Sequence, residues 1–273
     1  QVTIGDNSDP AWEATVGGDV YGGGDAAAVV GTPVVHVIAK TNTTIANVYG
    51  GGNAADVSGT NVTIDGGQIT GMVFGGGHGD KNSEPQKEAN VNGDVTLNVT
   101  GGTINKVFAG SNSKGNITGN VNFTINKGNT SNPMHITEVY GGGNEAAGNA
   151  GTINIICTGG ADEGIGDVYG GANAADINSG IALNITGGKI GRVFGGNNTS
   201  GAISGGINVT VDWSGSCGTN SLGSVFGAGN QAPYTGSPVV YIKNGTINNN
   251  VFGGGLGATA VVTGNPQVTV GNA

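Results

Sequence analysis

The stretch that decides the fold is Val48-Tyr49-Gly50-Gly51-Gly52-Asn53-Ala54-Ala55-Asp56, which returns almost unchanged as Val168-Tyr169-Gly170-Gly171-Ala172-Asn173-Ala174-Ala175-Asp176. Its opening pair, Val followed by Tyr or Phe and then small residues, occurs nine times, with successive valines 25 to 34 residues apart. A self-similar period of that length is typical of a solenoid rather than of a globular domain. The pairs are Val20-Tyr21, Val48-Tyr49, Val73-Phe74, Val107-Phe108, Val139-Tyr140, Val168-Tyr169, Val193-Phe194, Val225-Phe226 and Val251-Phe252.

A second pattern keeps step with the first. Segments such as residues 62–67, 95–102 and 181–188 alternate apolar and polar residues and end in glycine. Period-two alternation predicts a strand with one buried face and one solvated face. A short apolar step follows, for example at Ile69 and Ile104, before the Val-aromatic pair. Each repeat therefore predicts one coil with three short strands.

Composition supports this reading against the alternatives. The chain has 58 glycines among 273 residues, without the third-position glycine period that collagen requires. Its hydrophobic fraction of 36% and charged fraction of 10% are unlike those of a disordered chain. The sequence predicts an all-β, single-domain right-handed parallel β-helix over residues 1–273. About nine to ten coils at the ~4.8 Å strand spacing give a rod on the order of 45 Å long.

A column of amide side chains is expected along the coils. Seven of the nine positions that lie five residues after the repeat valines carry Asn or Asp. Stacked amides can pass hydrogen bonds from coil to coil, so we interpret these residues as a structural asparagine ladder. Its members are Asp25, Asn53, Asn112, Asn144, Asn173, Asn198 and Asn230, with His78 and Leu256 at the other two positions.

The aromatic residues of the repeat form a second column, with two interpretations. If the valines point inward, the rings point outward as a stripe that can stack on sugars, which makes them candidate ligand-binding residues. Alternatively the rings stack inside the protein, with the following glycines leaving room for them. The stripe comprises Tyr21, Tyr49, Phe74, Phe108, Tyr140, Tyr169, Phe194, Phe226 and Phe252.

The two cysteines are expected not to be bonded to each other. Cys157 aligns with Val99 and Ile185 on the inward phase of a strand, whereas Cys217 follows Trp213 two coils later. Two coils amount to ~9.6 Å, beyond the usual limit for bridged Cα atoms. The sequence therefore predicts no disulfide.

Catalysis is the alternative to a binding or structural role, because parallel β-helices also host polysaccharide lyases and glycoside hydrolases. The best-matched acids, Asp56 and Asp176, are four coils apart, ~19 Å at the strand spacing, too far for a carboxyl pair that hydrolyses a glycosidic bond. Glu145 and Asp176 lie on neighbouring coils and could approach each other, but no Arg or Lys lies beside them in sequence to act as a lyase base. We therefore predict no catalytic residues and no enzyme activity.

Metals, nucleic acid and membranes are also disfavoured as partners. The three histidines share no metal-ligand spacing, so we expect no metal site and no cofactor. A structural calcium ion at one or two Gly-rich turns is compatible with the sequence. A net charge of −9 with only nine basic residues disfavours nucleic acid. The sequence contains no apolar run of 18 residues, so we expect no membrane span.

Loop insertions distinguish some coils from the others. They fall at residues 79–92, 126–137 and 213–220, and the first holds the densest charge. Both chain ends read as uncapped strands, at residues 1–4 and 267–270. Uncapped strand edges promote association, so end-to-end self-association or flanking domains of a longer chain are expected.

The repeat style resembles that of right-handed β-helix, adhesin-like proteins displayed on bacterial surfaces. This resemblance covers nearly the whole chain but includes no family-defining functional residue. It implies a non-catalytic secreted or cell-surface protein of bacterial origin that acts in adhesion or as a structural spacer. Its expected partner is a glycan or a host or cell-surface protein.

Overall fold

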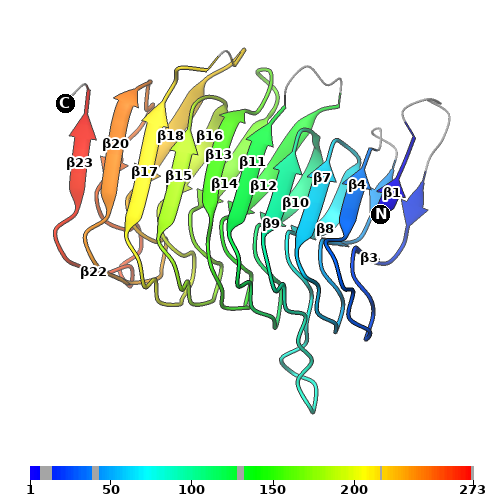
Figure 1. Cartoon of the computed structure of the whole chain (residues 1–273). Coiled ribbons are helices and arrows are strands. Elements are labelled where there is room, and N and C mark those ends of the chain that lie inside the picture. The colour runs from blue at the N-terminus through cyan, green and yellow to red at the C-terminus, as the bar shows by residue number, and fades with distance from the viewer. Residues whose placement is uncertain (7–13, 39–42, 128–131, 216, 272–273) are drawn as a thin grey trace.

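The computed structural model describes residues 1–6, 14–38, 43–127, 132–215 and 217–271 as one elongated parallel β-solenoid (Figure 1). The chain winds through successive coils so that its two ends lie at opposite ends of the body. No helix occurs among the described residues, and so none that could cross a membrane. The predicted parallel β-helix is confirmed.

Sheet A contains the alternating strands. Strands β7 (Thr60–Ile64) and β9 (Val95–Val99) share a register in which Val62 pairs with Leu97 and Ile64 with Val99, so the buried residues form continuous columns. Polar residues between them face outward. Its ten parallel strands are, in order, β1 (Val2–Ile4), β4 (Val34–Val37), β7 (Thr60–Ile64), β9 (Val95–Val99), β11 (Val121–Asn126), β13 (Thr152–Cys157), β15 (Ile181–Ile185), β17 (Ile207–Asp212), β20 (Val239–Asn244) and β23 (Gln267–Val270).

Sheet B contains the Val-aromatic pairs on equivalent strands, as predicted. In the middle coils the apolar step and the Val-aromatic pair belong to one bent strand rather than to two. The parallel strands are β2 (Thr15–Val16), β3 (Val20–Tyr21), β5 (Thr44–Ile45), β6 (Val48–Tyr49), β8 (Gln68–Phe74), β10 (Gly102–Phe108), β12 (Met134–Tyr140), β14 (Gly164–Tyr169), β16 (Lys189–Phe194), β18 (Ser221–Phe226) and β21 (Val251–Phe252).

The third side is less regular than predicted. It is joined by isolated parallel bridges such as Val57 to Val91 and Ile177 to Ile203, and by the short pair β19 (Tyr234–Thr235) and β22 (Val262–Thr263). Glycines let neighbouring coils approach closely here. A Cβ on Gly170 would lie 2.4 Å from the carbonyl oxygen of Gly195.

The aromatic rings are stacked and mostly buried. Neighbouring rings from Tyr21 to Phe252 lie 4.4–4.9 Å apart and nearly parallel. The seven rings from Tyr49 to Phe226 are at most 5% exposed and form their own cluster beside the aliphatic core. The interpretation of these seven as a ligand-facing stripe is therefore wrong, because no ligand reaches their faces. We call the nine rings the aromatic column.

The expectation of unpaired cysteines is also wrong, because Cys157 and Cys217 form a disulfide with Cα atoms 5.2 Å apart. Ile155, not Cys157, is the residue that pairs with Ile185 in sheet A. Between the cysteines, the coil of β15 and β16 turns tightly at Gly187, where a Cβ would lie 2.8 Å from the Cβ of Cys217. The loops of the two flanking coils converge over this glycine. The distance between the two cysteines is therefore not set by the spacing of the strands.

The insertions differ in structure. The first contains a hairpin in which Asp80 and Lys87 bridge antiparallel, and it projects from the body (Figure 1). Lys81 of this hairpin lies 3.1 Å from Glu145. Residues 128–131 of the second insertion lie outside the described residues. The third insertion supplies Cys217.

Candidate functional site

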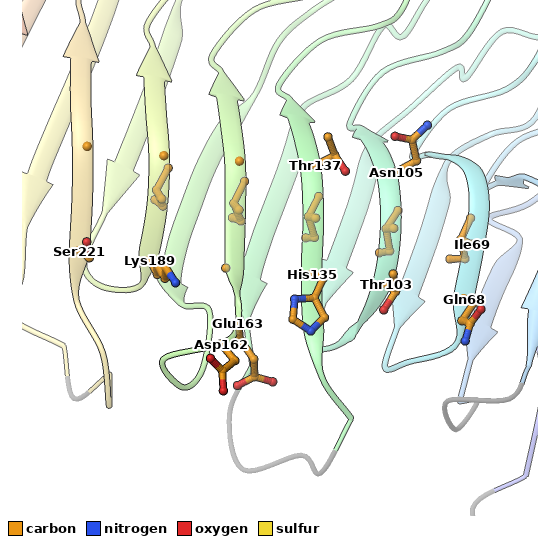
Figure 2. Close-up of a pocket in the computed structure, with 18 of the residues that line it drawn as sticks. Gln68, Ile69, Thr103, Asn105, His135, Thr137, Asp162, Glu163, Lys189 and Ser221 are labelled. Carbon is orange, nitrogen blue, oxygen red and sulfur yellow. The ribbon is translucent and has the colours of Figure 1, made fainter.

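A groove of about 820 Å³ crosses the outer face of sheet B from β8 to β18 (Figure 2). We call it the axial groove, because it crosses successive strands and so follows the long axis of the solenoid. It is lined by the residues on either side of a buried column, which consists of Ile69, Ile104, Ile136, Ile165, Ile190 and Leu222. The first row is Gln68, Thr103, His135, Gly164, Lys189 and Ser221, and the second is Thr70, Asn105, Thr137, Gly166, Gly191 and Gly223.

The groove arises from a break in strand alternation. Ile104 and Val107 are both buried although three positions apart, whereas Asn105 between them is exposed. A straight strand repeats every two residues, so the strand must bend at this point. At the bend, a Cβ on Gly166 would lie 2.5 Å from the backbone carbonyl oxygen of Thr137. A Cβ on Gly191 would lie 2.6 Å from the carbonyl oxygen of Gly166. The floor there is consequently bare backbone.

Charged side chains run beyond the second row but are paired with one another. The ammonium of Lys106 lies 2.7 Å from Glu138, and Nε of Arg192 donates to Asp167 at 2.8 Å. The hydroxyl of Tyr140 donates to Glu138 at 2.7 Å. These contacts hold the bend between neighbouring coils, and within the two rows of the groove only His135 and Lys189 are side chains that can carry charge.

The loop that we call the wall loop, residues 158–163, leads into β14 and contacts the starts of the two neighbouring groove strands, β12 at Met134 and β16 at Lys189. Figure 2 shows its Asp162 and Glu163 where the chain enters β14. Glu163 accepts hydrogen bonds from the backbone of Gly160 and Met134 and lies 2.8 Å from the Lys127 ammonium. Burial raises the pKa of Glu163, but these hydrogen bonds outweigh burial and place its pKa below the usual value. Glu163 is therefore an ionised structural anchor.

The asparagine ladder has the coil-to-coil hydrogen bonds that stacked amides imply. Asn144 donates to Asn112 at 3.0 Å, and the same bond continues through Asn173, Asn198 and Asn230 at 2.8–3.0 Å. A shorter run joins Asn53 to Asp25 at 2.6 Å and brings His78 Nδ1 within 2.7 Å of Asn53. Asn112 and Asn198 also donate to the hydroxyls of Tyr49 and Tyr140. Burial raises the pKa of Tyr49 to about 12.

The ladder predicts a stability effect at Asn173, which donates one ladder bond and accepts another. We expect Asn173→Ala to lower the free energy of unfolding by ~1–3 kcal/mol, because its neighbours lose their partners. Denaturant unfolding followed by circular dichroism measures this. The exposed Asn178→Ala, five residues away, is the matched control. Equal effects of the two substitutions would show that the column is only a turn preference.

The acids considered at the sequence level have local roles. Asp56 accepts a hydrogen bond from the backbone of Asn90 at 2.9 Å, and Asp176 accepts one from the backbone of Ala202 at 2.7 Å. The structure brings neither residue to the groove. In the described part of the chain, no three His, Cys, Asp or Glu side chains cluster as a metal site would require.

Sequence reasoning missed the groove residues, although a signal was present. The triplets around the apolar step, such as Thr103-Ile104-Asn105 and His135-Ile136-Thr137, place two outward positions on each strand from β8 to β18. Comparisons of the chain with protein-family models, with curated proteins and with solved structures found no match.

Proposed function

We propose that this protein is a non-catalytic β-helix, exposed on a cell surface or secreted, that binds a linear glycan along the axial groove. The observation that carries the proposal is the groove itself, with hydroxyl and amide groups facing it from successive coils. Ser, Thr, Asn and Gln both donate and accept hydrogen bonds, as sugar hydroxyls do. A lining whose polar groups are mostly hydroxyls and amides therefore suits a carbohydrate.

The repeat of the groove also suits a polymer. From β8 to β18 there are five steps between strands, which correspond to ~24 Å at ~4.8 Å a step. Each coil presents its own pair of outward positions, and on β8, β10 and β12 both positions carry polar side chains, so an extended chain of sugar units meets such groups at successive steps. A compact ligand would leave most of this length unused.

The disulfide supports an extracellular location. Disulfides form and persist in oxidising compartments and are rare in the cytosol of most organisms, and Cys157 and Cys217 are bridged here. An extended, rigid body with a lateral groove serves an adhesin or a surface spacer, which agrees with the resemblance to bacterial surface β-helix proteins. The partner on another cell would then be a glycan or a glycan-bearing protein.

Filling the groove tests the proposal. A glycan array with the purified chain identifies a ligand, and titration calorimetry then compares variants. We expect Asn105→Arg, which places a long side chain in the groove, to weaken binding about tenfold or more, ~1.4 kcal/mol for each factor of ten. The control is Asn122→Arg, an exposed position on the outer face of sheet A. Equal losses from both variants, or none from Asn105→Arg, would contradict the proposal.

A polysaccharide lyase is the second candidate. It is favoured by one observation: His135 and Lys189 both line the groove and flank Gly164. A lyase needs a base and a cation near one sugar residue, and these two side chains supply such groups. Ultraviolet absorbance of an unsaturated product, lost in His135→Ala, would support this alternative. Hydrolysis is less well supported, because Glu163, one of the two carboxyls in the lining, is held in an ion pair.

A further inference from the structure

The groove has a hollow near its centre where side chains are missing. Gly164 and Gly166 on β14 and Gly191 on β16 occupy positions that Thr103, Asn105 and Thr137 fill on earlier strands. His135 pairs with Gly164 across the sheet, and Lys189 lies on the other side of that glycine, where a Cβ on Gly164 would lie 2.7 Å from the carbonyl oxygen of Lys189. The hollow is therefore flanked by the two side chains of the groove that can carry positive charge.

Lys189 differs from most other basic residues of the chain. Of the eight basic residues that the structure describes, six form ion pairs, namely Lys81, Lys106, Lys114, Lys127, Arg192 and Lys243. Within the described ranges, Lys189 has no carboxylate within salt-bridge distance. Its ammonium donates to the carbonyl oxygen of Ala161 at 2.8 Å, which fixes it against the wall loop. An ammonium has three donors, so two remain for a ligand.

Negative charge also borders the hollow. Glu163 is neutralised by Lys127, whereas Asp162 is exposed on the wall loop and lines the groove. The whole chain carries a net charge of −9. A densely charged polyanion would be repelled by this field. A single anionic group near Lys189, on an otherwise neutral polymer, would gain the local attraction without that cost.

We infer that the hollow is a subsite for one carboxylate-bearing sugar, a uronic acid residue, within a largely neutral linear glycan. This inference rests on the proposed glycan-binding function and specifies its ligand class. Lys189, on β16, binds the carboxylate of this sugar. His135, on β12, borders the same sugar from the opposite side of the hollow. The neutral remainder of the lining, including Gln68, Thr103 and Asn105, receives the uncharged sugars.

The test uses oligosaccharides with isolated or alternating uronates. Glucuronoxylan and hyaluronan fragments are titrated into the intact chain beside their carboxyl-reduced forms, which keep the backbone and lose the charge. Chondroitin sulfate fragments separate carboxylate from sulfate recognition, and oligogalacturonate tests dense charge. We expect at least one uronate probe to bind about tenfold more tightly than its reduced form. Tighter binding of oligogalacturonate or of the sulfated fragments would overturn the inference.

Two substitutions that change the charge beside the hollow in opposite directions make the test more specific. We expect Lys189→Gln to weaken uronate binding about tenfold and to leave binding of the reduced form unchanged. Asp162→Asn should strengthen uronate binding, because it removes a repelling charge. Lys87→Gln, on the projecting hairpin, makes the same charge change elsewhere and should have no effect. Thermal melting of each variant checks that the wall loop is retained, and His135→Gln is a second variant if Lys189→Gln unfolds.

The outcomes separate this inference from the proposed function. If neutral and carboxyl-reduced glycans bind as tightly as the uronates, or if Lys87→Gln weakens binding as much as Lys189→Gln, the groove still binds glycan but the uronate subsite is wrong. If no glycan binds and groove-filling Asn105→Arg changes nothing, both proposals fail.

Discussion

Removal of the disulfide between Cys157 and Cys217 is expected to lower the free energy of unfolding by about 4 kcal/mol on the chain-entropy model. The bridge closes a loop with a sequence separation of 60 residues, so the unfolded chain gains considerable freedom when it is cut. It also fixes the start of the wall loop, which begins at the residue after Cys157. Denaturant unfolding with and without reductant measures the loss.

The double variant Cys157→Ser with Cys217→Ser is the control for this experiment. It should unfold at the same denaturant concentration with and without reductant, close to the reduced native chain. Free-thiol titration first checks that the reductant has opened the bridge. If the unfolding midpoint of the native chain is then the same with and without reductant, the expected contribution of the disulfide is contradicted.

Truncation of a ring inside the aromatic column is the other large expected effect. Phe108 is fully buried, with parallel rings on both sides from Phe74 and Tyr140 at 4.9 and 4.4 Å. We expect Phe108→Ala to cost about 3–5 kcal/mol, because the lost ring leaves a cavity between coils that are fixed by backbone hydrogen bonds. Thermal and denaturant unfolding measure the change.

Phe252 provides the matched control, because it is 43% exposed and has one stacked neighbour, Phe226. Phe252→Ala should cost clearly less than Phe108→Ala. The comparison also concerns function: if the rings are structural, a folded Phe252→Ala chain retains its glycan affinity. Similar unfolding costs for the two variants would show that stacking contributes little.

The architecture could be predicted from sequence because local pattern and repeat period agree. Period-two alternation places Val62 and Ile64 inward whatever the neighbouring coil is, and the repeat brings equivalent residues into register. The asparagine ladder follows from the same register, since Asn144 and Asn173 occupy equivalent turns. These features depend on spacing along the chain, which the sequence contains directly.

Three other features were settled only by tertiary structure. Period-two alternation implies that a ring beside an inward valine points to solvent, yet Tyr49 and its neighbours are covered by the stacked coils and the ladder. The cysteines meet because the short turn at Gly187 lets loops two coils apart converge. The axial groove needs the bend after Ile104 and bare glycines at the same place on successive coils. Sequence therefore determined what repeats along the axis, whereas the bends and loop lengths that vary between coils decided which surfaces are covered and which are open.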